Sequence, residues 1–422
     1  MSGFDMTTAA ATAVLKQLYS SDEISFKMFE QDPFLREIKK NTSFGGSGIK
    51  SLQVVSPLQG ASGDYASTQL GNNVYAGWNI TTLSHMFHKA YLDTEVMLRA
   101  NNDKNAFIDA LKSMQDGAIE TLRDRAETEI WGNGGRALAQ LASTSTVTTA
   151  VATLADRNQC VNLRVGMKIE ISSADGTSGA VTTAGGVNNY AYISAIDFTT
   201  GSVTITSDAA FTTTVAWNAA FNGAAASYYI FAYGDFKAAN SGISGALAWI
   251  PVSTPSSAAF HAVDRSVDPT RLAGHRIDAS SMTIQEGLIS AIARCKMEGA
   301  VGINRCYLNT DFFGQLVIET SGKLLRDPSD TKQNIGFQSM SIVGANGPVQ
   351  VYCSNKVPTN KAFLTRIEDW ELLSAGNFPQ VLDMDGLMIR KDTSTAGWAE
   401  EWAWYANLRN KAPVDSGIVS FV

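Results

Sequence analysis

The sequence predicts an α+β protein made of more than one compact unit. Three observations support this prediction: the length, one long amphipathic helix, and a charge-poor stretch rich in β-forming residues. The chain has 422 residues, beyond the size at which single hydrophobic cores usually stop growing. Charged residues make up 17% of it, against about 25% in average soluble domains. We therefore expect other chains to cover much of its surface.

The strongest helical signal lies between Asn101 and Trp131. Apolar side chains recur there at steps of three and four residues, which places them along one face of a helix. Such a helix would be on the order of 45 Å long. The sequence GNGG at 132–135 ends it, because glycine readily adopts the left-handed conformation of a helix end. The stripe consists of Phe107, Leu111, Met114, Ala118, Leu122, Ala126 and Ile130.

The chain before this helix holds few residues that could build a core of their own. Residues 1–50 predict an arm, with helix formers at 7–19 and glycines at its end. Residues 51–92 predict a two-stranded projection around a polar, glycine-punctuated loop at 57–79. An isolated hairpin is only marginally stable in water, so we expect it to lie on a neighbouring subunit. The expected contact residues are Leu70, Val74, Tyr75 and Trp78.

Composition changes abruptly after the helix. Residues 140–260 contain only ten Asp, Glu, Lys and Arg, and short alternating runs lie at 164–172, 189–197, 202–208 and 226–234. Low charge also fits a disordered tract, but enough bulky residues are present to favour a small ordered β-unit. These residues are Tyr190, Ile193, Ile196, Val203, Ile205, Tyr229 and Phe231.

The remaining chain predicts a mixture of helices and strands. Thr283 and Glu286 have capping-box spacing at the start of a helix that extends to about residue 298. A strand, a short helix and a strand pair with a turn at Asn346-Gly347 follow, and then a strand near 361–367. Near the end, Trp402, Trp404, Ala406 and Leu408 alternate along one strand face.

Composition limits the classes of function. Net charge is −7, with 33 Lys+Arg against 40 Asp+Glu, which argues against tight nucleic-acid binding but permits a container in which DNA can slide. The chain has no run of about 18 apolar residues and no secretion signal at its start, so we expect a cytoplasmic folding environment. The four cysteines lack any paired spacing, which favours reduced thiols. They are Cys160, Cys295, Cys306 and Cys353.

No well-specified catalytic or nucleotide-binding motif is present in the sequence. His85 and His88 could share a metal but lack a third ligand. Asp383 and Asp385 resemble the start of a calcium loop whose closing glutamate is missing, so a β-turn is favoured. We assign no catalytic, metal or cofactor-binding residue, no cofactor, and no enzymatic activity.

Two further groups have binding and structural interpretations. Lys323 and Arg326 lie among Asp327 and Asp330, a mixture of signs typical of a solvated or intersubunit loop rather than a phosphate site. Four tryptophans could stack on bases, but no basic residues are interleaved, so packing is favoured. These are Trp370, Trp398, Trp402 and Trp404.

The order of elements resembles that of tailed-bacteriophage major capsid proteins, which share the Johnson fold, also called Hong Kong ninety-seven-like. The passage VQVYCSNKVPTNKAFLTRIEDWEL is similar to the family's strand, Asn-x-Val-Pro turn and strand, here with the turn at Asn355 to Pro358. WAWYANLRNKAPVDSGIVSFV is similar to its usual ending. The resemblance covers nearly the whole chain, with an added stretch at 139–236.

The resemblance implies a division of the chain. It comprises an N-arm at 1–50, an extended E-loop at 51–92, a spine helix and first part of the P-domain at 93–138, and an inserted β-domain at 139–236. A central A-domain at 237–375 and the second part of the P-domain at 376–422 complete it.

The resemblance also implies a structural protein of the virion. Copies would assemble in the host cytoplasm into the hexamers and pentamers of an icosahedral shell around double-stranded DNA, bound without sequence specificity. Scaffold, portal and decoration proteins would be further partners. Two alternatives remain open: a β-rich binding module of a virion or cell surface, and an encapsulin-like container.

Overall fold

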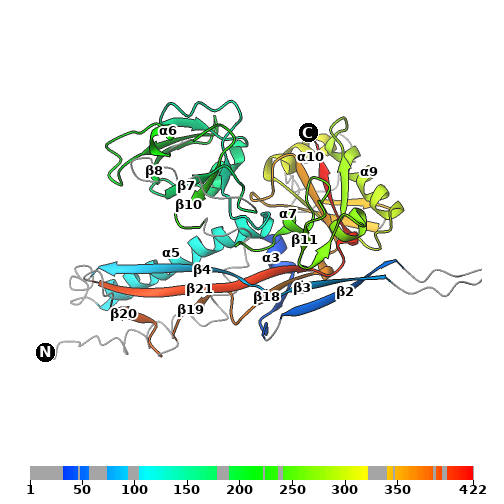
Figure 1. Cartoon of the computed structure of the whole chain (residues 1–422), viewed down its shortest axis with the longest axis horizontal. Helices are drawn as coiled ribbons and strands as arrows, with labels where there is room; N and C mark the ends of the chain where they lie inside the picture. Colours follow the sequence, from blue (N-terminus) through cyan, green and yellow to red (C-terminus); the bar gives the residue numbers. More distant parts are fainter. Residues whose placement is uncertain are drawn as a thin grey trace, which may run out of the picture.

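A computed structural model describes residues 32–45, 48–56, 74–93, 104–177, 190–221, 224–235, 241–321, 340–345, 347–383, 386–391 and 397–421. The predicted α+β class is confirmed. A hairpin, a long helix, a small sheet and a central helix-covered sheet follow one another in the order that the sequence predicts (Figure 1). The expected helix at 7–19 lies outside the described residues.

The predicted long helix is α5, Lys104–Trp131, and it ends at the expected residue. It runs along a sheet whose main strands are β4 (Ser84–Asp93) and β21 (Gly397–Asn410), paired antiparallel from Ser84↔Ala406 to Asp93↔Gly397 (Figure 1). We call this the long-strand sheet. The other strands are β1 (Lys39–Asn41), β18 (Trp370–Ser374), β19 (Gln380–Val381) and β20 (Ile389–Lys391).

The projecting hairpin differs from the prediction in its returning strand. Strand β2 (Ile49–Ser56) pairs antiparallel with β3 (Val74–Ile80), whereas residues 84–93 leave the hairpin and join β21 as β4. The prediction of one returning run through residue 92 was therefore wrong. Strands β3 and β4 have similar alternating patterns and differ in their partners. The partner of β4 is β21, which lies more than three hundred residues further along the sequence.

The stretch after α5 folds around its own hydrophobic core. Its six strands have the order β5-β10-β7-β8-β9-β6, which we call the peripheral sheet. Ile169, Ile193, Val203, Ile205 and Trp217 are among the buried side chains of this core. The strand bounds are β5 (Ala139–Gln140), β6 (Val151–Thr153), β7 (Lys168–Ser172), β8 (Ala191–Asp197), β9 (Ser202–Thr206) and β10 (Tyr229–Ala232), with the short helices η2 (Arg157–Asn162) and α6 (Trp217–Ala220).

A third, central sheet has the order β13-β22-β17-β14-β16-β15 and carries helices α9 (Ile284–Met297) and α10 (Thr310–Ser321). The predicted capping box is present at the start of α9, where Thr283 and Glu286 cap each other's backbone. The strands are β13 (His275–Asp278), β14 (Arg305–Leu308), β15 (Met340–Gly344), β16 (Gly347–Cys353), β17 (Lys361–Thr365) and β22 (Ser416–Ser420).

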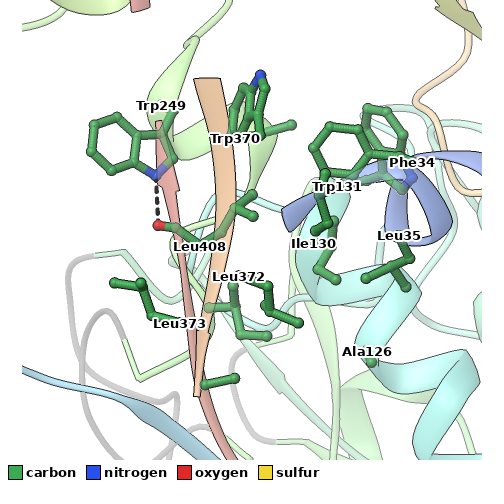
Figure 2. Close-up of a cluster of buried hydrophobic side chains, with 14 of the residues drawn as sticks. Phe34, Leu35, Ala126, Ile130, Trp131, Trp249, Trp370, Leu372, Leu373 and Leu408 are labelled. Atoms are coloured by element: carbon green, nitrogen blue, oxygen red, sulfur yellow. Dashed lines mark hydrogen bonds between the residues drawn. The ribbon is translucent and has the colours of Figure 1, made fainter. Parts of the chain in front are cut away.

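One large core joins the hairpin base, α5 and the long-strand sheet. Figure 2 shows its centre, where Phe34, Ile130 and Trp131 lie near strand β18, and the Trp249 indole N–H donates to the Leu408 carbonyl at 3.0 Å. Short elements complete this region: α3 (Pro33–Glu37), α7 (Ala246–Trp249), β11 (Ala259–Phe260), β12 (Val263–Asp264), α8 (Pro269–Ala273), η3 (Ile367–Asp369) and η4 (Pro413–Asp415). Within the described ranges, no helix is long and apolar enough to cross a membrane.

Candidate assembly surfaces

The β2–β3 hairpin lies at one edge of the molecule, below the central sheet (Figure 1). Leu52 on β2 is 73% exposed and Tyr75 on β3 is 54% exposed. Leu52 lies opposite Gly77 of β3. In the described part of the chain, no third strand pairs with either strand of the hairpin. The hairpin therefore offers exposed apolar side chains together with strand edges that no further described strand covers.

The base of the hairpin is anchored in this chain's own core. Trp78 is fully buried and meets Trp249 and Phe260 edge to face, with ring centroids 5.1 and 6.2 Å apart. The Asn79 backbone N–H donates to the carbonyl of His261 at 2.9 Å. The prediction that Trp78 contacts a neighbouring subunit is corrected, because no part of its side chain remains exposed.

Of the other three predicted contact residues, only Tyr75 has a described side chain. Tyr75 is 54% exposed, and its contact with a neighbouring subunit stays a prediction. Val74 begins β3, but its side chain lies outside the described residues, as does the whole of Leu70. Sequence periodicity could have separated Tyr75 from Trp78, because residues three apart on a strand point to opposite faces.

A second exposed surface lies on strand β4. Phe87 is 59% exposed and Tyr91 is 44% exposed, and they alternate with the buried Met86 and Ala90. The Phe87 ring meets Tyr405 on β21 edge to face, with centroids 6.0 Å apart. We call Phe87, Tyr91 and Tyr405 the aromatic stripe. Such an ordered row on a solvent-facing sheet is typical of a contact surface.

The opposite face of the long-strand sheet is closed by helix α5. Trp402 and Trp404 are fully buried, as is Trp370, and Phe378 packs on Trp404 with ring centroids 5.3 Å apart. These three tryptophans therefore have the packing role that the sequence favours. The fourth, Trp398, is partly exposed.

A buried carboxyl group lies in this contact between sheet and helix. The Gln115 side-chain amide donates to Glu400 Oε1 at 3.0 Å, and both side chains are fully buried. Burial raises the pKa of Glu400 to about 7, because removing water disfavours the charged carboxylate.

Asp32 joins the start of the described chain to the body. One carboxylate oxygen accepts the Phe34 backbone N–H at 2.8 Å, and the other accepts the Trp131 indole N–H at 3.0 Å and the Ser354 hydroxyl at 3.2 Å. Burial raises its pKa, and these hydrogen bonds oppose the shift. Asp32 was not predicted as a site residue, although Asp followed by Pro33 at a helix start is a usable capping signal.

Only some of the weak chemical candidates lie within the described residues. His85 and His88 lie on β4, and among the described residues no group of three or more His, Cys, Asp or Glu could hold a metal ion. The Gly386 backbone N–H donates to the Asp383 carbonyl at 2.7 Å, as in a β-turn, while Asp385 lies outside the described residues. Lys323, Arg326, Asp327 and Asp330 also lie outside them.

Comparisons with known proteins find similarity only among solved structures. No family model matches the chain, and no curated protein matches it. The capsid asymmetric unit of cyanophage A-1(L) is 10% identical, with 92% of each chain covered and a TM-score of 0.49. The procapsid of satellite phage P4 including its size determination protein is 8% identical, covering 95% of this chain and 90% of that chain, with a TM-score of 0.42.

A third structure is the holo-SrpI encapsulin complex from Synechococcus elongatus PCC 7942. It is 10% identical, covers 97% of this chain and 95% of that chain, and has a TM-score of 0.39.

Proposed function

We propose that this chain is the major capsid protein of a tailed double-stranded DNA phage, which assembles through hexamers and pentamers into an icosahedral head. The observation that carries the proposal is the β2–β3 hairpin, a two-stranded projection with Leu52 and Tyr75 exposed. These two side chains gain little from burial within one molecule, because each is more than half exposed. Packing on a second copy would bury its apolar side chains and use its free edges.

The aromatic stripe supports the same proposal from a different part of the molecule. Phe87 and Tyr91 expose large rings on the outer face of the long-strand sheet. In a repeating shell, another copy of the chain would pack on this aromatic stripe. Many such contacts would make assembly cooperative and concentration dependent.

The finer features of the proposal concern domains, partners and place. We retain the division given by the sequence, with the returning strand of the extended loop now ending at Ile80. Scaffold, portal and decoration proteins are the further partners, and assembly takes place in the host cytoplasm before the protein resides in the virion. The net charge of −7 suits an inner wall that does not hold DNA tightly. The protein has no enzymatic role in this proposal.

Negative-stain electron microscopy of the purified full-length chain tests this function. Closed shells of uniform size are the expected result, and small particles at every concentration would contradict it. Analysis of the contents of shells formed in the host separates a genome container from an encapsulin-like one, since double-stranded DNA is expected and a protein cargo would favour the alternative. A glycan or protein ligand retained by a chain that forms no shells would favour the binding-module alternative.

A further inference from the structure

The chain enters the peripheral sheet after α5 and leaves it after β10. These outgoing and returning connections meet at one buried carboxylate. Arg136, on the outgoing connection, places Nε 3.2 Å from Oε1 of Glu129 on α5, and both side chains are more than nine-tenths buried. The other oxygen of Glu129 accepts the backbone N–H of Ile243, on the returning connection, at 3.0 Å. One helical turn earlier, Arg125 pairs with Asp235 at the end of the unit. Both connections are thus held against α5.

A second attachment lies away from these connections. Lys356 belongs to the turn between β16 and β17 of the central sheet, and its side chain is 2% exposed. Its ammonium lies 2.5 Å from Asp124 Oδ1 on α5 and donates to Asn162 Oδ1 at 3.0 Å and to the Val161 carbonyl at 3.4 Å. Asp124 also faces Arg164, next to η2, at 3.5 Å. One buried ammonium therefore contacts α5 and the peripheral unit from the central sheet.

A third attachment, at the surface, joins η2 of the peripheral unit to residues near α10 and β17 of the central sheet. The Asn158 side-chain amide donates to Thr359 Oγ1 at 2.8 Å and to Asp311 Oδ2 at 3.1 Å. Arg157 pairs with the same Asp311 carboxylate at 3.3 Å, and both side chains are well exposed. Exposed pairs contribute little to stability, so the buried Lys356 contact is the stronger of these two attachments.

We infer that the unit built on the peripheral sheet is an intramolecular brace that fixes helix α5 relative to the central sheet, with Lys356 as its positioning residue. A unit tethered only by its two connections needs no contact with the turn at 355–358. Any movement that separates Lys356 from its partners leaves a charge buried and unpaired, which is strongly unfavourable. The brace acts within one subunit, so it stands independently of the proposed shell function.

Amide hydrogen exchange on the purified, unassembled full chain tests this inference, with Lys356→Met as the variant. We expect exchange at residues 157–163 and in the last two turns of α5 to accelerate roughly tenfold or more, while β7 to β9 stay protected by their own core. Lys112→Met, at an exposed position on the same helix, is the matched control. Unchanged exchange at 157–163 relative to that control would overturn the brace.

A double variant separates positioning from simple charge neutralisation. Asp124→Asn combined with Lys356→Met leaves neither partner of the buried pair charged, so the melting temperature should recover towards that of the natural chain. Exchange at 157–163 should stay fast, because Asn162 and Val161 still lack the hydrogen bonds from Lys356. Recovery of slow exchange together with stability would refute a positioning role. Should Lys356→Met fail to fold, Asn162→Ala makes the same regional test without burying a charge, and unchanged exchange there would also refute it.

Discussion

Trp78 of the hairpin and Trp249 of helix α7 meet edge to face, with ring centroids 5.1 Å apart and no exposed area on either side chain. Their contact ties one end of strand β3 to the core of the molecule. Three residues earlier on the same strand, Tyr75 is exposed. The hairpin is thus rigidly held at its base and open to other molecules beyond it.

Replacing these two residues of β3 should therefore have opposite effects. Trp78→Ala should lower the free energy of unfolding by about 3–5 kcal/mol, since it opens a cavity in a core that cannot fully collapse. Tyr75→Ala should change stability by less than about 1 kcal/mol but reduce shell formation. Chemical denaturation of the unassembled chain and light scattering during assembly measure the two effects. Equal loss of stability in both variants would contradict the structure.

The tight turn between β11 and β12 holds two non-glycine residues with positive φ. His261 has φ 47° and Ala262 has φ 70°, a conformation that favours glycine in two-residue hairpin turns. Ala262→Gly should raise stability by about 0.5–1 kcal/mol because it relieves this strain. Ala293→Gly, at an exposed site in helix α9, should instead lower stability by about 1 kcal/mol. Thermal unfolding of both variants checks the opposite signs, and a loss of stability in Ala262→Gly would refute the assignment.

Burial of Glu400 makes stability depend on pH. Its pKa of about 7 lies above the ordinary value of 4.5, so between these values the folded chain holds a proton that the unfolded chain releases. The stability that depends on a protonated Glu400 is fully present below pH 4.5 and is lost as pH rises through 7. Glu400→Gln should therefore be more stable than the natural chain at pH 8 by up to about 3 kcal/mol, with little difference at pH 4.5.

Urea unfolding at the two pH values measures this difference on the unassembled chain. Glu401→Gln, at the neighbouring partly exposed position of β21, controls for the change in side-chain chemistry. The same stability gain at both pH values would show that Glu400 titrates as an ordinary carboxyl group.

Local signals in the sequence predict the elements whose partners lie close in the chain. The α5 stripe from Ala118 to Ile130, the GNGG stop and the Thr283 capping box each depend on a few neighbouring residues, and each is present. The contacts made by single polar side chains over long separations were not predictable in this way. Lys356 and Asp124 lie more than two hundred residues apart, and neither residue type indicates burial by itself.

The candidate surfaces show the same limit. Exposure of Tyr75 and burial of Trp78 follow from strand alternation, but only once the start of β3 is known. The error in the returning strand arose because β3 and β4 have similar alternating patterns. Their partners, β2 and β21, are selected by tertiary packing that no local window contains.

The central claim is that the extended hairpin is satisfied only between copies of the chain. The most direct test replaces Leu52 and Tyr75, the exposed side chains of the hairpin, with aspartate and leaves the anchored base at Trp78 intact. Electron microscopy of the variant and the natural chain, purified in parallel, should show closed shells from the natural chain alone, with unfolding of the unassembled chains unchanged. Normal shells from the double variant would contradict the account.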